Sequence, residues 1–241
     1  MWIISLTLAC FVIFFTRGWQ QRLTLKRWRT TLALDKHAAI YQQLDADVDG
    51  FTLSQTARAK RDAIEYVYGE IDFESFIALL SLCKPNRSTI FYDLGSGTGK
   101  AVLACAMVFE VQKSCGIEFF SLLDHCAKQQ QQRLKLIPEY RLQANRIEFR
   151  QGDMLENQFS DATLLFINST AFFGETWCAI SKQVEQIKPG TLVITTSKTL
   201  HSQLFRTIRQ TAVKMSWGIV DAFIQQRQPN NIPNPCFSQD I

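Results

Sequence analysis

The residues best placed to do chemistry form a glycine-rich turn behind an apolar stretch. Thr89–Leu94 has strand character and contains a single acid, Asp93, and the glycines that follow occupy alternate positions: Gly95, Gly97, Gly99. Glycine lets the backbone approach a ligand, and the helix expected after the turn offers unpaired N–H donors. Dinucleotide sites use G-x-G-x-x-G for a pyrophosphate, which this carboxylate would repel. Asp93 can instead hold the ammonium of an amino-acid moiety. S-adenosylmethionine carries that group without phosphates.

Two further acids follow the next predicted strands. Glu118 ends Ser114–Glu118, 25 residues after Asp93, close to the spacing at which an acid holds ribose hydroxyls in nucleotide folds. Asp153 follows the third strand, where it could accept the adenine amino group, and Met154 could cover the ring. Each acid alone would be a solvated charge. Together at three successive strand ends, where open α/β sheets bind ligands, they predict a cofactor site.

The segment after the fourth strand would receive the methyl acceptor. Asn168 can hydrogen-bond cofactor or acceptor, and Phe172 or Phe173 could wall a narrow apolar channel. Core packing is the alternative for at least one phenylalanine. No Asn-Pro-Pro-Tyr-like string occurs, which disfavours DNA-adenine and glutamine methyltransferases.

The elements that must position these residues alternate between strands and helices. The pattern predicts an α/β, mostly parallel sheet with helices on both faces, closed by a hairpin over Thr211–Met215 and Ile219–Gln226. The predicted strands are Thr89–Leu94, Ser114–Glu118, Ile147–Gln151, Thr163–Asn168 and Leu192–Thr196, and the predicted helices are Lys100–Glu110, Ser121–Leu136 and Glu175–Ile187.

The N-terminus is strongly apolar and free of charged side chains up to Thr16. Residues 1–16 would span about 24 Å as a helix, and continuation to Trp19 gives about 28 Å against a hydrocarbon core of about 30 Å. Five basic residues follow, so the positive-inside rule predicts a single-pass membrane anchor over 1–19 with the rest on the cytoplasmic side. A helix docked on the domain is the alternative. The basic residues are Arg17, Arg22, Lys26, Arg27 and Arg29.

Composition narrows the function further. The net charge of +4 resides in this basic segment, because the chain from Asp35 onward carries −1, which argues against a large nucleic-acid footprint. The seven cysteines include no C-x-x-C pair and none stands at zinc-ligand spacing with a histidine, so we expect reduced thiols and no metal.

The chain divides into four predicted parts. Residues 1–19 form the hydrophobic helix, 20–63 a basic and helical connecting region, 64–227 the methyltransferase domain, and 228–241 a Pro/Asn-rich tail. The oligomeric state is left open.

Several strings together carry a family resemblance. In order over about residues 64–200, the chain resembles the catalytic core of the Dot-type (disruptor of telomeric silencing) lysine methyltransferases, which have the Rossmann-like class I methyltransferase fold. The strings are Tyr68-Gly69-Glu70, Phe73, the Asp93–Gly99 loop, Gly116-Ile117-Glu118, Gly152-Asp153-Met154, Asn168–Gly174 and Thr195-Thr196-Ser197-Lys198. Membrane-anchored mitochondrial lysine methyltransferases share a similar glycine loop and offer a second analogy.

The resemblance implies a role for each matching position. Tyr68 and Glu70 would lie in a loop that closes over the cofactor, and Asn168 near the transferred methyl. The remaining cofactor contacts would come from Asp93, Gly95, Ser96, Gly97 and Gly99 at the methionine part, Glu118 at the ribose, and Asp153 and Met154 at the adenine. The chain departs from the family where Glu65-Tyr66 replaces Pro-Glu, where Ser169 replaces a second Asn, and in lacking the family's basic chromatin-binding extension.

These features predict an S-adenosylmethionine-dependent enzyme that methylates a protein lysine at a membrane. Asn168, Phe172 and Tyr68 are its expected catalytic residues. A small-molecule or lipid methyltransferase, or a degenerate membrane-bound binding module, remains the alternative.

Overall fold

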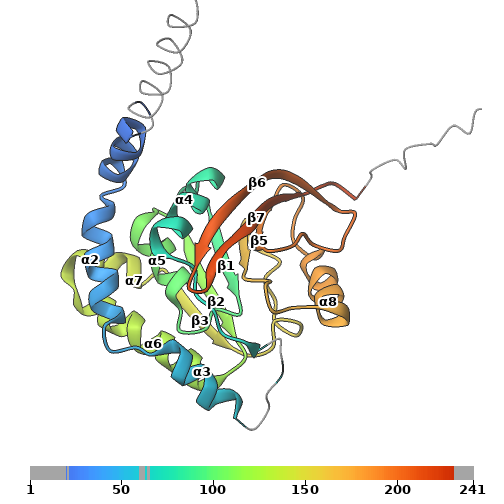
Figure 1. Cartoon of the computed structure of the whole chain (residues 1–241), viewed down its shortest axis with the longest axis horizontal. Coiled ribbons are helices and arrows are strands. Elements are labelled where there is room, and N and C mark those ends of the chain that lie inside the picture. The colour runs from blue at the N-terminus through green and yellow to red at the C-terminus, as the bar shows by residue number, and fades with distance from the viewer. Residues whose placement is uncertain (1–19, 21, 60–62, 64–65, 231–241) are drawn as a thin grey trace, which may run out of the picture.

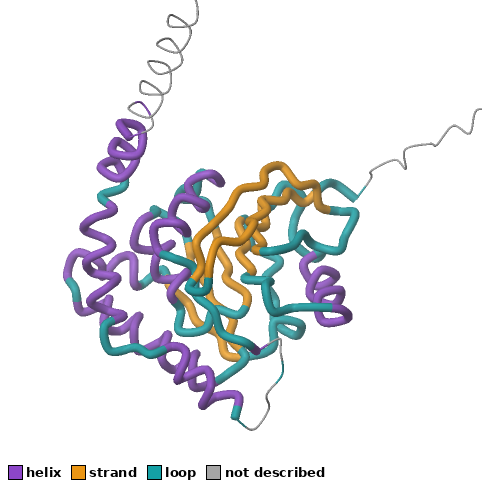
Figure 2. Tube along the Cα trace, in the orientation of Figure 1, coloured by secondary structure: helices purple, strands orange, loops and turns teal. Residues whose placement is uncertain are grey.

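The computed structural model describes residues 20, 22–59, 63 and 66–230, and their strands form one seven-stranded sheet in the order β3-β2-β1-β4-β5-β7-β6. Helices lie on both faces of this sheet (Figures 1 and 2). The strands are β1 Ile90–Leu94, β2 Lys113–Glu118, β3 Ile147–Gln151, β4 Leu164–Ile167, β5 Leu192–Thr196, β6 Phe205–Met215 and β7 Gly218–Arg227. The helices are α2 Leu34–Asp45, α3 Gly50–Arg58, α4 Phe73–Cys83, α5 Lys100–Val108, α6 Ser121–Leu136, the 3₁₀ turn η2 Pro138–Tyr140, α7 Arg141–Ala144 and α8 Gly174–Val184.

Strands β1 to β5 are parallel, as the sequence predicts, because their apolar runs bury both faces of the sheet. In β1, Phe91 packs in one core cluster and Tyr92 in the other. The register sets Asp93 beside Gly116 of β2 and Phe166 of β4, one residue before β1 ends. The carboxylate therefore belongs to the edge where the strands end.

The closing hairpin is longer than the sequence indicates. β7 runs antiparallel between β5 and β6, and β6 begins at Phe205 rather than near Thr211. The first half of β6 is an exposed sheet edge, so it lacks the alternation of apolar residues from which a half-buried strand is predicted.

Helices α4 to α7 cover one face of the sheet and α8 the other. Trp177 of α8 is fully buried against the strands on its side. The predicted connecting region is more closely integrated than a linker, because α2 packs on α5 and α3 on α6. Asp49 caps α3 by accepting a hydrogen bond from the Thr52 amide (3.0 Å).

The predicted apolar helix over residues 1–19 and most of the 228–241 tail lie outside the described residues. No helix in the described ranges is long and apolar enough to cross a membrane. Residues 22–31 are helical and mostly exposed, and they project at one side of the molecule (Figure 1), but the last turn contacts the body, where the Trp28 indole donates to Ser81 Oγ of α4 (3.1 Å).

Candidate active site

A cavity of about 510 Å³ opens at the carboxyl ends of the parallel strands. That volume lies within the range of small-molecule sites. Its walls come from the loops after β1, β2, β3 and β4, from residues 66–71, from Ser54 of α3 and from Trp217 in the β6–β7 turn. Of the residues predicted from the sequence, the cavity is lined by Tyr68, Glu70, Asp93, Gly95, Ser96, Gly97, Glu118, Asp153, Met154, Asn168 and Phe172.

The glycine turn has the geometry that its spacing predicts. Gly97 has a φ of +54°, and a Cβ there would lie 2.7 Å from the Tyr68 ring, so neither conformation nor space favours a side chain. Gly99 does not line the cavity. A Cβ at Gly99 would meet Phe149 and Ala127 within 3 Å, so this glycine lets α5 approach its neighbours closely.

Asp93 is buried, and its Oδ1 has no hydrogen-bond partner among the described residues. Burial, with a smaller contribution from the nearby Glu118, raises the pKa of Asp93 to about 8. The hydroxyl of Ser96, also buried, is similarly unpartnered. A buried unpaired carboxylate is costly, and a cationic ligand group in the cavity would relieve that cost. The site therefore fits the ammonium of a methionine moiety.

Glu118 joins the glycine turn to the end of β2. One carboxylate oxygen accepts from the Gly97 amide (2.8 Å) and the other from the Phe120 amide (2.9 Å). Burial raises the pKa of Glu118, while the two amides act in the opposite direction. Because a carboxylate oxygen has two lone pairs, both oxygens can accept further hydrogen bonds from a ligand.

Asp153 and Met154 lie in the turn after β3. Asp153 Oδ1 accepts from the Leu155 amide (2.8 Å), which fixes the carboxyl at the cavity wall. The Met154 methyl lies 3.6 Å from the position that a Cβ on Gly95 would take. Met154 therefore faces the glycine turn across the cavity edge.

Tyr68 and Glu70 form the roof of the glycine turn. The Tyr68 hydroxyl donates to Glu70 Oε1 (2.8 Å) and lies 3.0 Å from the Thr98 hydroxyl. Burial and the adjacent carboxylate raise the pKa of Tyr68 well above its ordinary value, so the phenol keeps its proton. The other Glu70 oxygen accepts from Lys100 Nζ (2.7 Å).

Asn168 connects the end of β4 to this roof. Its Nδ2 donates to the Gly69 carbonyl (3.2 Å), and its Oδ1 accepts from the Thr196 hydroxyl (2.8 Å) at the end of β5. The sequence left open whether Phe172 or Phe173 lines the channel, and the two side chains differ in this respect. Phe172 lines the cavity and stacks on Trp177 with ring centroids 6.4 Å apart, whereas Phe173 is 56% exposed and does not line it.

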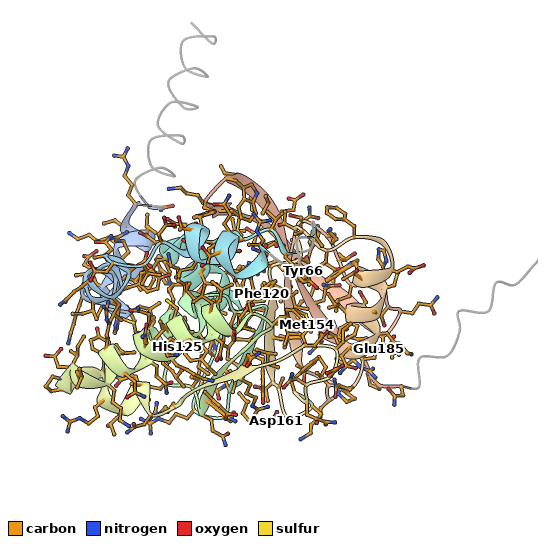
Figure 3. All side chains as sticks on the ribbon, turned by 90° about the horizontal axis from the view of Figure 1, so that it is seen from below. Tyr66, Phe120, His125, Met154, Asp161 and Glu185 are labelled. Atoms are coloured by element: carbon orange, nitrogen blue, oxygen red, sulfur yellow. The ribbon has the colours of Figure 1, made fainter. Side chains whose placement is uncertain are left out.

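Several wall residues were not predicted from the sequence. Tyr66 meets Phe120 edge-to-face with centroids 5.1 Å apart, and Figure 3 shows this pair beside Met154. Trp217 lies so close to the backbone that a Cβ at Gly69 would fall 1.9 Å from its ring. The sequence could have indicated Phe120, because two adjacent aromatic residues directly follow Glu118 at a strand end. No local sequence pattern indicates that Ser54, Lys100 or Trp217 belongs to the cavity wall.

Solved structures share this fold at low identity. An RNA methyltransferase from Salinibacter ruber, crystallised with S-adenosyl-L-homocysteine, is 23% identical with a TM-score of 0.51, and the match covers 67% of this chain and 94% of that one. TrmN from Thermus thermophilus is 14% identical with a TM-score of 0.55, covering 71% and 53%. These likenesses establish the Rossmann-like methyltransferase fold.

The curated relatives with similar sequences indicate a narrower class of methyltransferase. The Caenorhabditis elegans histone-lysine N-methyltransferase, H3 lysine-79 specific, is 29% identical over 152 residues, which cover 60% of this chain and 16% of the relative. The protein of the same name from Candida glabrata is 26% identical over 139 residues, covering 54% and 21%. This chain therefore spans a small part of the relatives it matches.

The predicted membrane localisation is wrong. The relatives are named for a lysine of histone H3, a chromatin protein. The prediction relied on the apolar character of residues 1–19, which would span about 28 Å as a helix, and on the basic residues after them; these are local features that say nothing of the substrate. A single-pass anchor with a cytoplasmic catalytic domain is therefore withdrawn.

The family itself is established by the sequence model described as histone methylation protein DOT1, which matches residues 54–223, more than half of the 241-residue chain. S-adenosylmethionine is the cofactor of this methyltransferase family, and the unpaired Asp93 carboxylate and the cavity beside it fit that molecule. With its fold, its site geometry and its relatives in agreement, the chain belongs to the Dot1 family of histone methylation proteins.

Proposed function

We propose that this chain transfers a methyl group from S-adenosylmethionine to the side-chain amine of a protein lysine, with a histone as the substrate. The observation that carries the proposal is the buried, unpaired Asp93 carboxylate at the wall of a cavity of cofactor size. The H3-lysine specificity named for the relatives supports the choice of acceptor. Residues 64–227 would form the methyltransferase domain, with α3 adding Ser54 to the cavity wall.

Four positions would hold the cofactor. Asp93 would pair with the ammonium of the methionine part, because its carboxyl lines the cavity and its buried Oδ1 has no hydrogen-bond partner among the described residues. Glu118, already fixed by two backbone amides, would accept from the ribose hydroxyls. Asp153 would accept from the adenine amino group and Met154 would pack on its ring, both at the same cavity wall.

The acceptor end would be shaped by Asn168, Phe172 and Trp217, which line the cavity beyond the glycine turn. The bound cofactor supplies an electrophilic methyl on a sulfonium, and in-line displacement depends mainly on alignment of the attacking amine. Asn168 would fix the region of transfer because both ends of its side-chain amide are tied to neighbouring segments. Tyr68 would act by holding the roof, since its phenol keeps its proton and donates it in a hydrogen bond to Glu70.

A lysine must lose its proton before it can attack. Its ordinary pKa is about 10.4, and transfer into an apolar channel lowers that value because the charged form is disfavoured. The Phe172 and Trp217 rings would supply this surface. No dedicated base is needed under this proposal.

The test is methyl transfer to defined acceptors. The full chain is incubated with labelled S-adenosylmethionine and either intact nucleosomes or free histones, and the modified residue is located by mass spectrometry. We expect methyl-lysine in a histone, and much less of it with the Glu118→Ala variant at a cofactor concentration that does not saturate the wild type. Label on an oxygen, a lipid or a small metabolite, with no methyl-lysine formed, would contradict the acceptor while leaving the cofactor proposal intact.

A further inference from the structure

Lys100 occupies an unfavourable position for a cation. It is the first residue of α5, directly after the glycine turn, where the helix dipole favours negative charge. Its side chain is only 17% exposed. A lysine buried here needs compensating partners, and it has two.

Both partners are carboxylates from segments outside the glycine turn. Lys100 Nζ donates to Glu70 Oε2 (2.7 Å) in the roof and to Asp45 Oδ2 (2.8 Å) at the last residue of α2. Neither carboxylate is freely solvated, because their side chains are 19% and 34% exposed. The ammonium thus joins α2, the roof and the glycine turn at one point.

Glu70 in turn contacts Tyr68, which lies against the glycine turn of the cavity. Glu70 Oε1 holds the Tyr68 hydroxyl, and the Tyr68 ring lies against Gly97. On the far side, a Cβ at Gly50 of α3 would lie 2.6 Å from the Tyr68 hydroxyl and 2.8 Å from Glu70 Oε1. The roof is therefore held between Lys100 and the start of α3.

We propose that Lys100 is a positioning residue through which Asp45 of α2 holds the Tyr68–Glu70 roof closed over the cofactor. Asp45 lies upstream of residues 54–223, so this link extends the cofactor site beyond the part of the chain that matches the family. The inference rests on the proposed function, because it assigns the roof a part in cofactor binding. Lys100 does not take part in the transfer; it acts through Glu70.

The experiment uses the full chain with Asp45→Asn, Lys100→Met, Lys100→Arg and the Asp45→Asn/Lys100→Met double variant. Lys182→Met is the matched control, since Lys182 of α8 pairs with Glu185 just after the helix but is 80% exposed. Two quantities are measured: the affinity for S-adenosyl-L-homocysteine by calorimetry, and amide hydrogen exchange of residues 66–72 without ligand.

We expect about a tenfold loss of affinity for Lys100→Met and about three- to fivefold for Asp45→Asn, in the range of measured coupling between sites. In the double variant, Asp45→Asn should add nothing further, because its link is already cut. Exchange over residues 66–72 should accelerate in Lys100→Met and in Asp45→Asn and stay unchanged in the control. Lys100→Arg should keep both the affinity and the exchange rate close to those of the wild type. Should Lys100→Met fail to fold, Asp45→Asn alone decides through the same two measurements.

Unaltered exchange over residues 66–72 in Asp45→Asn would overturn the proposal, as would a full additional loss of affinity in the double variant. Wild-type protein that binds no S-adenosyl-L-homocysteine would instead refute the proposed function. In that case the exchange measurement, which needs no ligand, would still decide whether Lys100 couples α2 to the roof.

Discussion

The cofactor end and the acceptor end of the cavity are built in different ways. At the cofactor end, the contacts connect neighbouring strand ends, as when Glu118 accepts from the Gly97 amide 21 residues away. At the acceptor end, Asn168 donates to the Gly69 carbonyl 99 residues away. The first end follows from the order of strands in a parallel sheet. The second depends on how loops from distant parts of the chain pack together.

Substitutions at the two ends should therefore impair the enzyme in different ways. Changes at the cofactor end should alter ligand affinity, whereas changes at the acceptor end should alter turnover or the KM for the acceptor while affinity for the cofactor persists. The four predictions that follow test this separation.

The largest effect is expected for Glu118→Ala. The variant loses the proposed ribose acceptor and also frees the Gly97 and Phe120 amides. Charged hydrogen bonds contribute about 1.5–3 kcal/mol, so affinity for S-adenosyl-L-homocysteine should fall about 10- to 100-fold by calorimetry. Glu118→Gln, which keeps the shape, should lose less. Equal affinity of wild type and Glu118→Ala would break the assignment of this end.

Asp93→Asn should lower the affinity for the cofactor but raise the stability of the ligand-free protein at alkaline pH. The pKa of Asp93 is about 8 in the folded state against an ordinary 3.8, so the folded protein holds this proton more tightly. The resulting stabilisation is complete below about pH 4 and is lost as pH rises to about 8, at a cost of a few kcal/mol. Without ligand, Asp93→Asn should therefore unfold at higher denaturant than wild type at pH 8.5 but not at pH 4. Its cofactor affinity should fall about tenfold, because the ammonium loses its counter-charge. A wild-type stability that is flat between pH 4 and 8 would contradict this account.

At the acceptor end, Asn168→Ala should lower kcat about tenfold and change cofactor affinity by less than about twofold, because a side chain that fixes alignment acts mainly on turnover. The exposed Asn145, which does not line the cavity, provides the matched control. Stopped assays at saturating cofactor, paired with calorimetry, measure both quantities. A loss of affinity as large as the loss of kcat would place Asn168 at the cofactor end.

The smallest effects distinguish the two phenylalanines. Phe172→Leu should raise the KM for the histone acceptor by about three- to fivefold, because it reduces the apolar wall. Phe173→Leu should stay within about twofold, since this ring is exposed and lies under Lys198 Nζ (3.8 Å to its centre) outside the cavity. The reverse order in steady-state kinetics would show that the acceptor enters over Phe173.

Much of the cofactor end is predictable because it is local. Alternation of apolar runs and helical segments predicts the five parallel strands, and the acids at their ends fall on one edge of the sheet as a consequence. Predicted strand and helix bounds differ from the observed ones by a few residues, as at Thr163–Asn168 against Leu164–Ile167. The exposed first half of β6 escaped prediction because an edge strand carries little hydrophobic pattern.

The amino-acid sequence by itself determined the parallel sheet, the glycine turn and the identity of the acids beside it, because strand period, turn chemistry and strand order are properties of short segments. The tertiary structure alone decided that Asp93 is left unpaired, that Gly99 packs rather than lines the cavity, and that Trp217 lies against Gly69. It alone joined Asp45 to Lys100 across 55 residues. Such contacts depend on the packing of separate layers around one core, and no periodicity within a segment records which distant side chain will meet it.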